Sequence, residues 1–158
     1  ALPILFVSNG NPYFTVHVGG QYREADSPDT LMETDRWYHL AGVFDGQEVR
    51  TYLDGKLVST VQGSGERRQN GLPLLVGADV DANGQGVSHF TGAIDGVRLS
   101  KIARYDGQSF EPSRRHVPDA DTLLLLNFDG FVGPWAYDDS DRQAHAMKVG
   151  DVLLQPVD

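Results

Sequence analysis

The fold is decided within residues 36–61, whose sequence is RWYHLAGVFDGQEVRTYLDGKLVSTV. Two Asp-Gly pairs, Asp45-Gly46 and Asp54-Gly55, divide this stretch into three short runs rich in alternating apolar residues. An Asp-Gly pair between such runs is a strong hairpin signal, because a tight turn requires residues that tolerate positive φ. The stretch therefore predicts three antiparallel strands joined as a meander.

The alternation within these runs predicts which faces are buried. Both faces of the first run, residues 36–44, are mostly apolar, with Trp37 on one face and Phe44 on the other. Such a strand is expected in the centre of a sandwich whose interior includes both side chains. In the strand predicted at 48–53, Tyr52 shares a face with a glutamate and an arginine, so we expect that face to be solvated.

Short apolar or alternating runs predict further strands outside the meander, and five Asp-Gly pairs mark turns along the chain. The predicted strands are residues 2–7, 13–18, 21–24, 72–76, 89–100 and 123–128, with candidate final strands at 144–149 and 152–154. The run at 123–128 is the most apolar, and its six residues match a strand better than a helix, so we expect it to be fully buried. The fold class that follows is all-β, an antiparallel two-sheet β-sandwich.

The composition limits the function classes. The 158 residues include no cysteine, which removes disulfides and cysteine nucleophiles. The net charge is −9, and such a surface repels phosphate backbones, so we expect no nucleic-acid partner. No apolar run approaches the roughly 20 residues of a membrane span. Because the chain starts at Ala1 rather than at Met, we expect a processed chain or a piece of a longer protein.

Several motifs, in one order along the chain, make the sequence resemble the LamG-like jelly-roll family, within the concanavalin A-like lectin/glucanase fold. The matching residues are 37–41 (WYHLA), 44–46 (FDG), 52–55 (YLDG), 75–77 (LVG), 90–100 (FTGAIDGVRLS) and 103–105 (ARY). The sequence departs from the family at Gly96, where a Glu usually follows Ile-Asp. The strand pair that usually opens such domains is also not found, although 124–130 (LLLNFDG) is similar to its beginning.

The resemblance implies jelly-roll topology and a function that is usually not catalytic. Family members bind glycans, bind other proteins or act as spacers, often within larger secreted proteins, and many related domains hold calcium at the rim of the sandwich. We therefore expect residues 1–158 to form a single LamG-like domain, a module or fragment of a larger secreted or periplasmic protein. The C-terminal segment 119–158 is expected to complete the sandwich with its buried strand.

Asp79, Asp81 and Asn83, followed by Gly84, form the sharpest candidate for a metal site. Oxygen ligands at alternate positions and a glycine for the bend are typical of calcium loops. An EF-hand is excluded, because its twelfth position would require Glu and here holds Phe90. The alternative is a polar hairpin loop whose Asp and Asn side chains cap their own backbone. Calcium is therefore a candidate cofactor.

Trp135, Tyr137 and Asp138 form the candidate ligand site, since aromatic faces beside carboxylates suit sugar stacking and hydrogen bonds to hydroxyls. The alternative is that these loop aromatics fold onto the edge of the sandwich. Asp95 has no acidic neighbour on its strand, whereas a retaining glycosidase needs two close carboxylates, so no catalytic residue is predicted. For His39 we expect a position in the core.

The leading hypothesis is thus a non-catalytic recognition module that binds carbohydrate or extracellular matrix, with calcium as a candidate cofactor for binding. The alternative, from another class, is a structural or assembly module that packs against a neighbouring domain or subunit.

Overall fold

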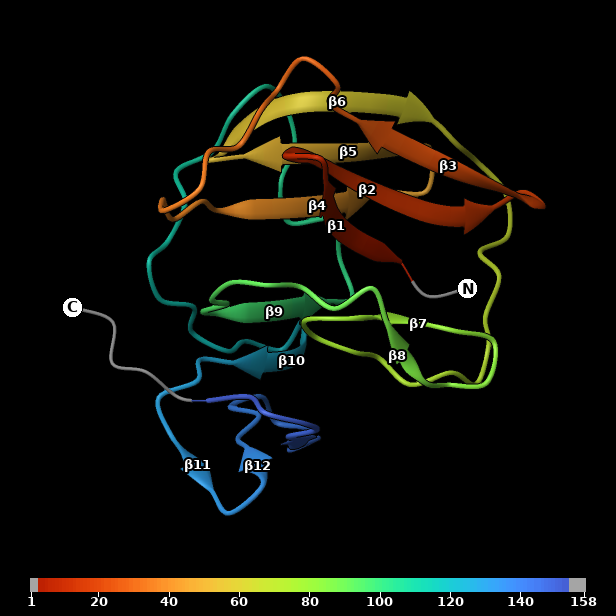
Figure 1. Cartoon of the computed structure of the whole chain (residues 1–158). Coiled ribbons are helices and arrows are strands. Elements are labelled where there is room, and N and C mark those ends of the chain that lie inside the picture. Colours follow the sequence, from red (N-terminus) through yellow and green to blue (C-terminus); the bar gives the residue numbers. More distant parts are fainter. Residues whose placement is uncertain (1–2, 154–158) are drawn as a thin grey trace. The chain divides into compact units, whose positions relative to one another are not determined.

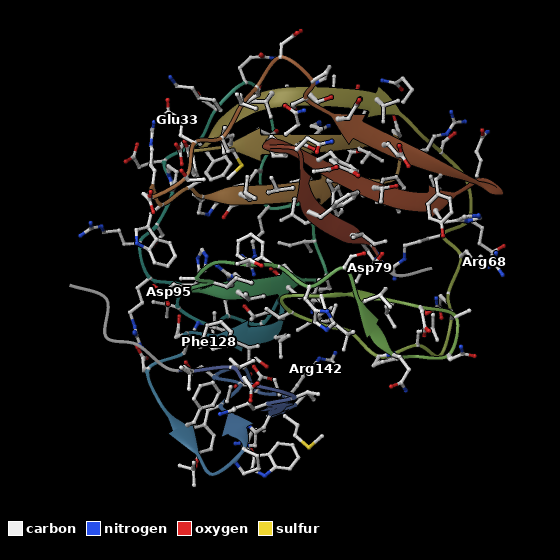
Figure 2. The ribbon with its side chains drawn as sticks, viewed as in Figure 1. Glu33, Arg68, Asp79, Asp95, Phe128 and Arg142 are labelled. Carbon is white, nitrogen blue, oxygen red and sulfur yellow. The ribbon has the colours of Figure 1, made fainter. Side chains whose placement is uncertain are left out.

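The computed structural model describes residues 3–153, and that part of the chain is all-β, with strands but no helix (Figure 1). The side chains of this part are drawn in Figure 2. The strands are β1 (Ile4–Ser8), β2 (Asn11–Val18), β3 (Gln21–Asp26), β4 (Leu40–Phe44), β5 (Glu48–Leu53), β6 (Lys56–Gln62), β7 (Asp79–Val80), β8 (Gly86–Val87), β9 (Val97–Ser100), β10 (Thr122–Leu126), β11 (Phe131–Val132), β12 (Trp135–Ala136) and β13 (Ala146–Met147).

The chain divides into two compact units. Unit 1 comprises Ala1–Thr91 and Ala103–Pro112, and unit 2 comprises Gly92–Ile102 and Ser113–Asp158. The expectation that 119–158 completes the sandwich of a single domain concerns the relation between these units, and it stays a prediction.

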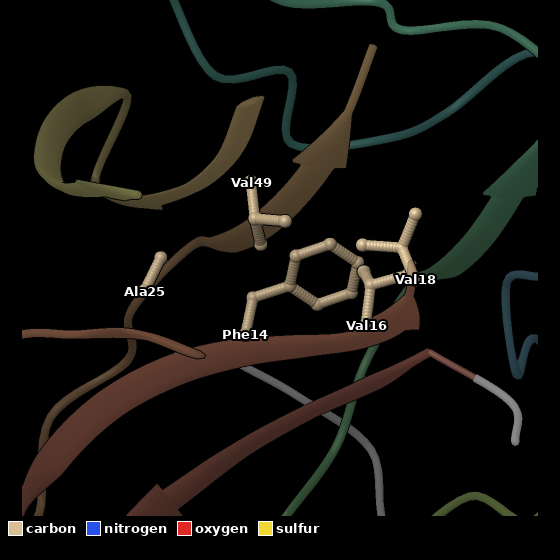
Figure 3. Close-up of a cluster of buried hydrophobic side chains, with 5 residues drawn as sticks. All are labelled: Phe14, Val16, Val18, Ala25 and Val49. Carbon is tan, nitrogen blue, oxygen red and sulfur yellow. The ribbon is translucent and has the colours of Figure 1, made fainter. Parts of the chain in front are cut away.

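Unit 1 contains two three-stranded antiparallel sheets, in the orders β1-β2-β3 and β4-β5-β6. Buried side chains from the first sheet, including Phe14, Val16 and Ala25, form one core cluster with Val49 of β5 in the second sheet (Figure 3). The two sheets therefore pack face to face and bury their apolar faces against each other, as the sandwich prediction requires.

The meander is confirmed, and each of its two Asp-Gly turns contains at least one residue with positive φ. Asp54 and Gly55 both have positive φ, at 49° and 75°, and they connect β5 to β6. In the turn between β4 and β5, the Asp45 carboxylate accepts hydrogen bonds from the backbone N–H groups of Gln47 and Glu48, at 2.9 and 2.8 Å. Side-chain capping and tolerance of positive φ are the reasons that Asp-Gly is favoured in such turns.

The second face of this sheet is also buried, which corrects the prediction for Tyr52. The Tyr52 side chain is fully buried with Ala41 and Val43, and Tyr105 and Phe110 pack against them. A register shift between Thr51 and Tyr52 interrupts the simple alternation of β5. The prediction that this face is solvated was wrong, because the segment 103–112, which is distant in sequence, covers it.

Trp37 is not part of the interior, contrary to the prediction, and 52% of it is exposed. The first meander strand begins at Leu40, since Asp35 has a positive φ of 60° and the chain is irregular until His39. The hairpin closes at His39, which forms two hydrogen bonds with Asp54. The N–H of His39 donates to Oδ1 of Asp54, and the N–H of Asp54 donates to the carbonyl of His39. Phe44 does pack against the core of unit 1.

Three further strand predictions differ from the structure. Residues 72–76 form no strand, and Pro73 lacks the N–H that a ladder needs. The run 89–100 shortens to β9, because Gly96, with a φ of 62°, interrupts the extended chain directly before it. Val152 and Leu153 are also not in a strand. Leu2 and Leu154, at the ends of two predicted strands, lie outside the described residues.

Unit 2 is built on β10, which pairs with β9, and on a small sheet of order β11-β12-β13. The leucine tract is confirmed as a buried strand, with Leu125 fully buried and Leu126 nearly so. β12 pairs with both neighbours, so that Trp135 lies opposite Val132 on one side and Met147 on the other. The candidate final strand at 144–149 thus contains β13.

We predict that Gly42→Ala destabilises the protein by about 1–3 kcal/mol, the usual cost of overpacking a core. A Cβ at Gly42 would lie 2.3 Å from the ring of Phe14, between the two sheets of unit 1. The free energy of unfolding from urea denaturation measures the effect. Gly71→Ala is the matched control, because its Cβ would meet nothing within 4 Å. Equal stability of the two variants would contradict the close approach of the sheets.

Candidate functional site

An open groove of about 510 Å³ in unit 2 brings together the predicted aromatic residues. Trp135 and Tyr137 are 43% and 45% exposed, respectively, and both line the groove. Trp135 belongs to the central strand of its small sheet, which fixes its backbone by pairing on both sides. The remaining lining residues are Val132, Gln143, Ala144 and His145. The groove therefore has aromatic and apolar walls with amide and imidazole groups at its side.

Asp138, the third residue of the predicted ligand site, does not line this groove and is only 4% exposed. Its Oδ1 accepts hydrogen bonds from the backbone N–H groups of Leu125, at 2.8 Å, and Ser140, at 2.9 Å. Its Oδ2 accepts from the Ser140 hydroxyl, at 2.8 Å, and from the Ala144 N–H, at 2.9 Å. Each oxygen of the carboxylate thus accepts two hydrogen bonds. Through them, Asp138 joins β10 to the loop after β12 within unit 2.

The ionisation of Asp138 follows from these bonds. Burial by itself raises the pKa of Asp138, but the backbone N–H groups of Leu125 and Ser140, the Ser140 hydroxyl and the Ala144 N–H lower it by more. The net result is a pKa below the ordinary value of a carboxyl, because each of these donors stabilises the charged form. At neutral pH the carboxylate is therefore charged, and its two oxygens accept hydrogen bonds from groups within unit 2.

His145 is one of the groove residues that sequence reasoning did not single out. Its Nδ1 accepts the backbone N–H of Asp138 at 3.1 Å, and its ring meets that of Tyr137 edge to face, with the centroids 5.0 Å apart. The acceptor role of Nδ1 leaves Nε2 to carry the proton. His145 has no motif spacing to a second histidine, so only the fold reveals its place beside Tyr137.

The candidate calcium loop lies in unit 1 as the short hairpin β7–β8. Oδ1 of Asp81 accepts the backbone N–H groups of Asn83 and Gln85, both at 2.8 Å. Oδ1 of Asp79 accepts a hydrogen bond from the N–H of Val80 at 2.7 Å, and the Asp79 side chain is exposed. The hydrogen bond from Gln85 is the main reason that the pKa of Asp81 is lowered, with a further contribution from Asn83.

These contacts match the self-capping alternative better than a calcium cage. Calcium takes six to eight oxygen ligands, whereas the Oδ1 atoms of both Asp79 and Asp81 accept backbone N–H groups of the loop itself. Residues 3–153 also contain no group of three or more His, Asp or Glu side chains placed to hold a metal ion. We derive no function through a metal at this loop, and calcium binding stays a prediction.

The two other polar residues considered from the sequence lie outside the aromatic groove. His39 is half-buried, with its ring edge to face against Phe110 at a centroid distance of 5.6 Å. Burial lowers the pKa of His39, and nearby Asp54 partly offsets that effect. Asp95 is exposed, on the irregular chain before β9.

We predict that Asp138→Asn destabilises the protein by about 3 kcal/mol at pH 7, because an amide cannot accept all four hydrogen bonds. Since the folded-state pKa is lowered, the contribution of the carboxylate is complete above about pH 4 and is lost as the pH falls through that lower pKa. The difference between wild type and variant should therefore shrink in acid. Urea denaturation from pH 7 to pH 2 measures it, and a difference independent of pH would contradict this role.

A comparison with family models adds a finding about the first two thirds of the chain. The model described as the concanavalin A-like lectin/glucanases superfamily, of laminin G type, matches residues 2–108. Neither a curated protein nor a solved structure is similar enough to match. The matched range covers more than half of the chain and contains both three-stranded sheets of unit 1. The chain therefore belongs to the concanavalin A-like lectin/glucanase superfamily, as a LamG-like domain with a jelly-roll β-sandwich fold.

Proposed function

We propose that this chain is a non-catalytic recognition module that binds carbohydrate or extracellular matrix, with carbohydrate held in the aromatic groove of unit 2. The observation that carries the proposal is the pair of half-exposed rings, Trp135 and Tyr137, that line one groove. Membership of the superfamily supports a binding module of lectin/glucanase type in general. The groove itself lies beyond the range that the family model matches.

The chemistry of the groove suits a neutral sugar. Its volume of about 510 Å³ lies in the range of small-ligand sites, about 300–1,000 Å³. The rings of Trp135 and Tyr137 provide flat apolar surface for the C–H face of a pyranose. The indole N–H and the phenol O–H of such residues can also form hydrogen bonds. Gln143 and His145 supply donors for hydroxyl groups. No lysine, arginine or acidic side chain is among the described lining residues, so recognition there does not depend on charge.

The same lining favours binding over hydrolysis. A glycosidase usually needs a pair of carboxylates beside the scissile bond. The nearest candidate in sequence, Asp138, has both of its oxygens engaged in hydrogen bonds within the loop. LamG-like domains are generally non-catalytic, although the superfamily includes glucanases.

An extracellular source for the ligand agrees with the family, whose LamG-like members are typically extracellular. None of the described residues form a helix with the length and apolar character needed to cross a membrane.

We predict that Trp135→Ala weakens glycan binding about thirtyfold or more, because truncating an anchoring aromatic costs about 2 kcal/mol or more. A glycan array identifies the ligand, and titration calorimetry with that glycan measures the affinity. Trp37→Ala is the matched control, since Trp37 is 52% exposed but belongs to unit 1. Equal losses in the two variants would contradict the assignment.

Repeating the array with EDTA tests the calcium hypothesis separately. A glycan signal that disappears with EDTA and returns with added calcium would support calcium-assisted binding. If Asp81→Asn then bound the glycan as tightly as wild type, the calcium would not be held by the loop that contains Asp79, Asp81 and Asn83.

A second candidate function, assembly with a neighbouring domain or subunit, is favoured by a different observation. Val132, Met147 and Val149 are exposed apolar side chains in the same part of unit 2 as Trp135. Contiguous exposed apolar surface often marks a protein interface. Absence of any glycan signal, together with concentration-dependent association in sedimentation velocity that Met147→Lys abolishes, would favour assembly over recognition.

A further inference from the structure

A second groove lies in unit 1, and its chemistry differs from that of the aromatic groove. It has a volume of about 460 Å³ and is lined by Arg23 of β3, Gln47 of the β4–β5 turn, Gln62 at the end of β6, and Gly63 and Ser64 beyond it. The N–H of Gly63 donates to the carbonyl of Gln47 at 2.8 Å, which ties the two loops together. The groove thus lies at one end of the β4-β5-β6 sheet, beside the edge strand of the other sheet.

The position of Arg23 in its strand directs it toward the interior between the sheets. Arg23 lies opposite Val16 in the β2–β3 ladder and two residues before Ala25, and both of those side chains are fully buried. Residues that pair across an antiparallel ladder, or that are two apart on a strand, share a face of the sheet. Gly63 leaves space for the aliphatic part of the Arg23 side chain, because a Cβ at position 63 would lie only 2.8 Å from Cγ of Arg23.

The guanidinium of Arg23 has no anionic partner within the described chain. Its Nε is buried without a hydrogen-bond acceptor, and Arg23 forms no ion pair with any acid of residues 3–153. Glu48 is already engaged, by the Gln62 amide at 2.6 Å and by Nε of Arg50 at 3.0 Å. A half-buried cation without a partner is costly, and it stands out in a chain with 22 acidic residues.

We propose that this groove binds the carboxylate of an acidic sugar of the uronic-acid class. A guanidinium presents a planar set of donors that matches a carboxylate in a bidentate pair. Because Nε is out of reach of solvent, the two terminal nitrogens hold the anion. The exposed Gln47 and Ser64 side chains supply an amide and a hydroxyl for the sugar hydroxyls. This site goes beyond the proposed function, since it belongs to the other unit and does not require the aromatic groove.

The test is a titration of the full chain, followed by amide NMR spectra, with sodium glucuronate, glucose and sodium sulfate as separate probes. Glucuronate is expected to shift the amide signals of Gly63 and Ser64. Glucose, which lacks the carboxylate, is expected to bind at least about tenfold more weakly, and so is sulfate, which lacks the sugar hydroxyls that Gln47 and Ser64 would contact. No shift with glucuronate, or equal affinity for glucose or sulfate, would overturn the proposal.

Variants locate the site. Arg23→Gln should lower the affinity for glucuronate about tenfold or more, and Arg23→Lys should restore only part of it, because an ammonium lacks the planar fork. Arg67→Gln makes the same change of charge in unit 1 at an exposed position outside the groove, and it should leave the affinity within about twofold.

Gly63→Ala is a second variant that keeps the charge. Its Cβ displaces the stem of Arg23, so it should also weaken glucuronate binding while the dispersion of the amide spectrum is retained. If Arg23→Gln and Gly63→Ala are folded and bind glucuronate as wild type does, the assignment is overturned.

Discussion

The central constraint of unit 1 is that its second sheet is buried on both faces. Val49 faces the first sheet, and Tyr52, on the same strand, faces the segment 103–112. The two Asp-Gly turns set the register that makes this possible, because each turn determines which residues pair across it. A slip by one residue would exchange the two sets of side chains, and both cores would be lost together.

In unit 2 a polar group has the corresponding role. The buried carboxylate of Asp138 links the N–H of Leu125 in β10 to the turn that contains Ser140 and Ala144. A buried charge is stable only when hydrogen bonds replace its water, and here four donors do so. The same loop carries Tyr137 and His145, so the order that Asp138 imposes also positions the walls of the aromatic groove.

The two grooves offer different chemistry on one chain. The groove of Trp135 is neutral and aromatic, whereas the groove of Arg23 is cationic and lined by amides and a hydroxyl. The residues of the cationic groove lie within the range 2–108 that matches the superfamily, and those of the aromatic groove lie after it. Sequence reasoning identified Trp135 and Tyr137, since aromatics beside acids are visible locally. It missed Arg23, whose significance depends on what surrounds its guanidinium.

The amino-acid sequence by itself determined the all-β class, the meander and the buried leucine tract, because alternation and Asp-Gly turns act between residues close in the chain. Only the tertiary structure decided that Trp37 is exposed, that Tyr52 is covered, and that Asp138 serves the fold rather than the groove lining. The Tyr52 hydroxyl donates to the carbonyl of Gly107, 55 residues away, and Asp138 accepts from Leu125, 13 residues away. Burial and hydrogen-bond partners of this kind arise from segments that meet only after folding, so no local pattern can specify them.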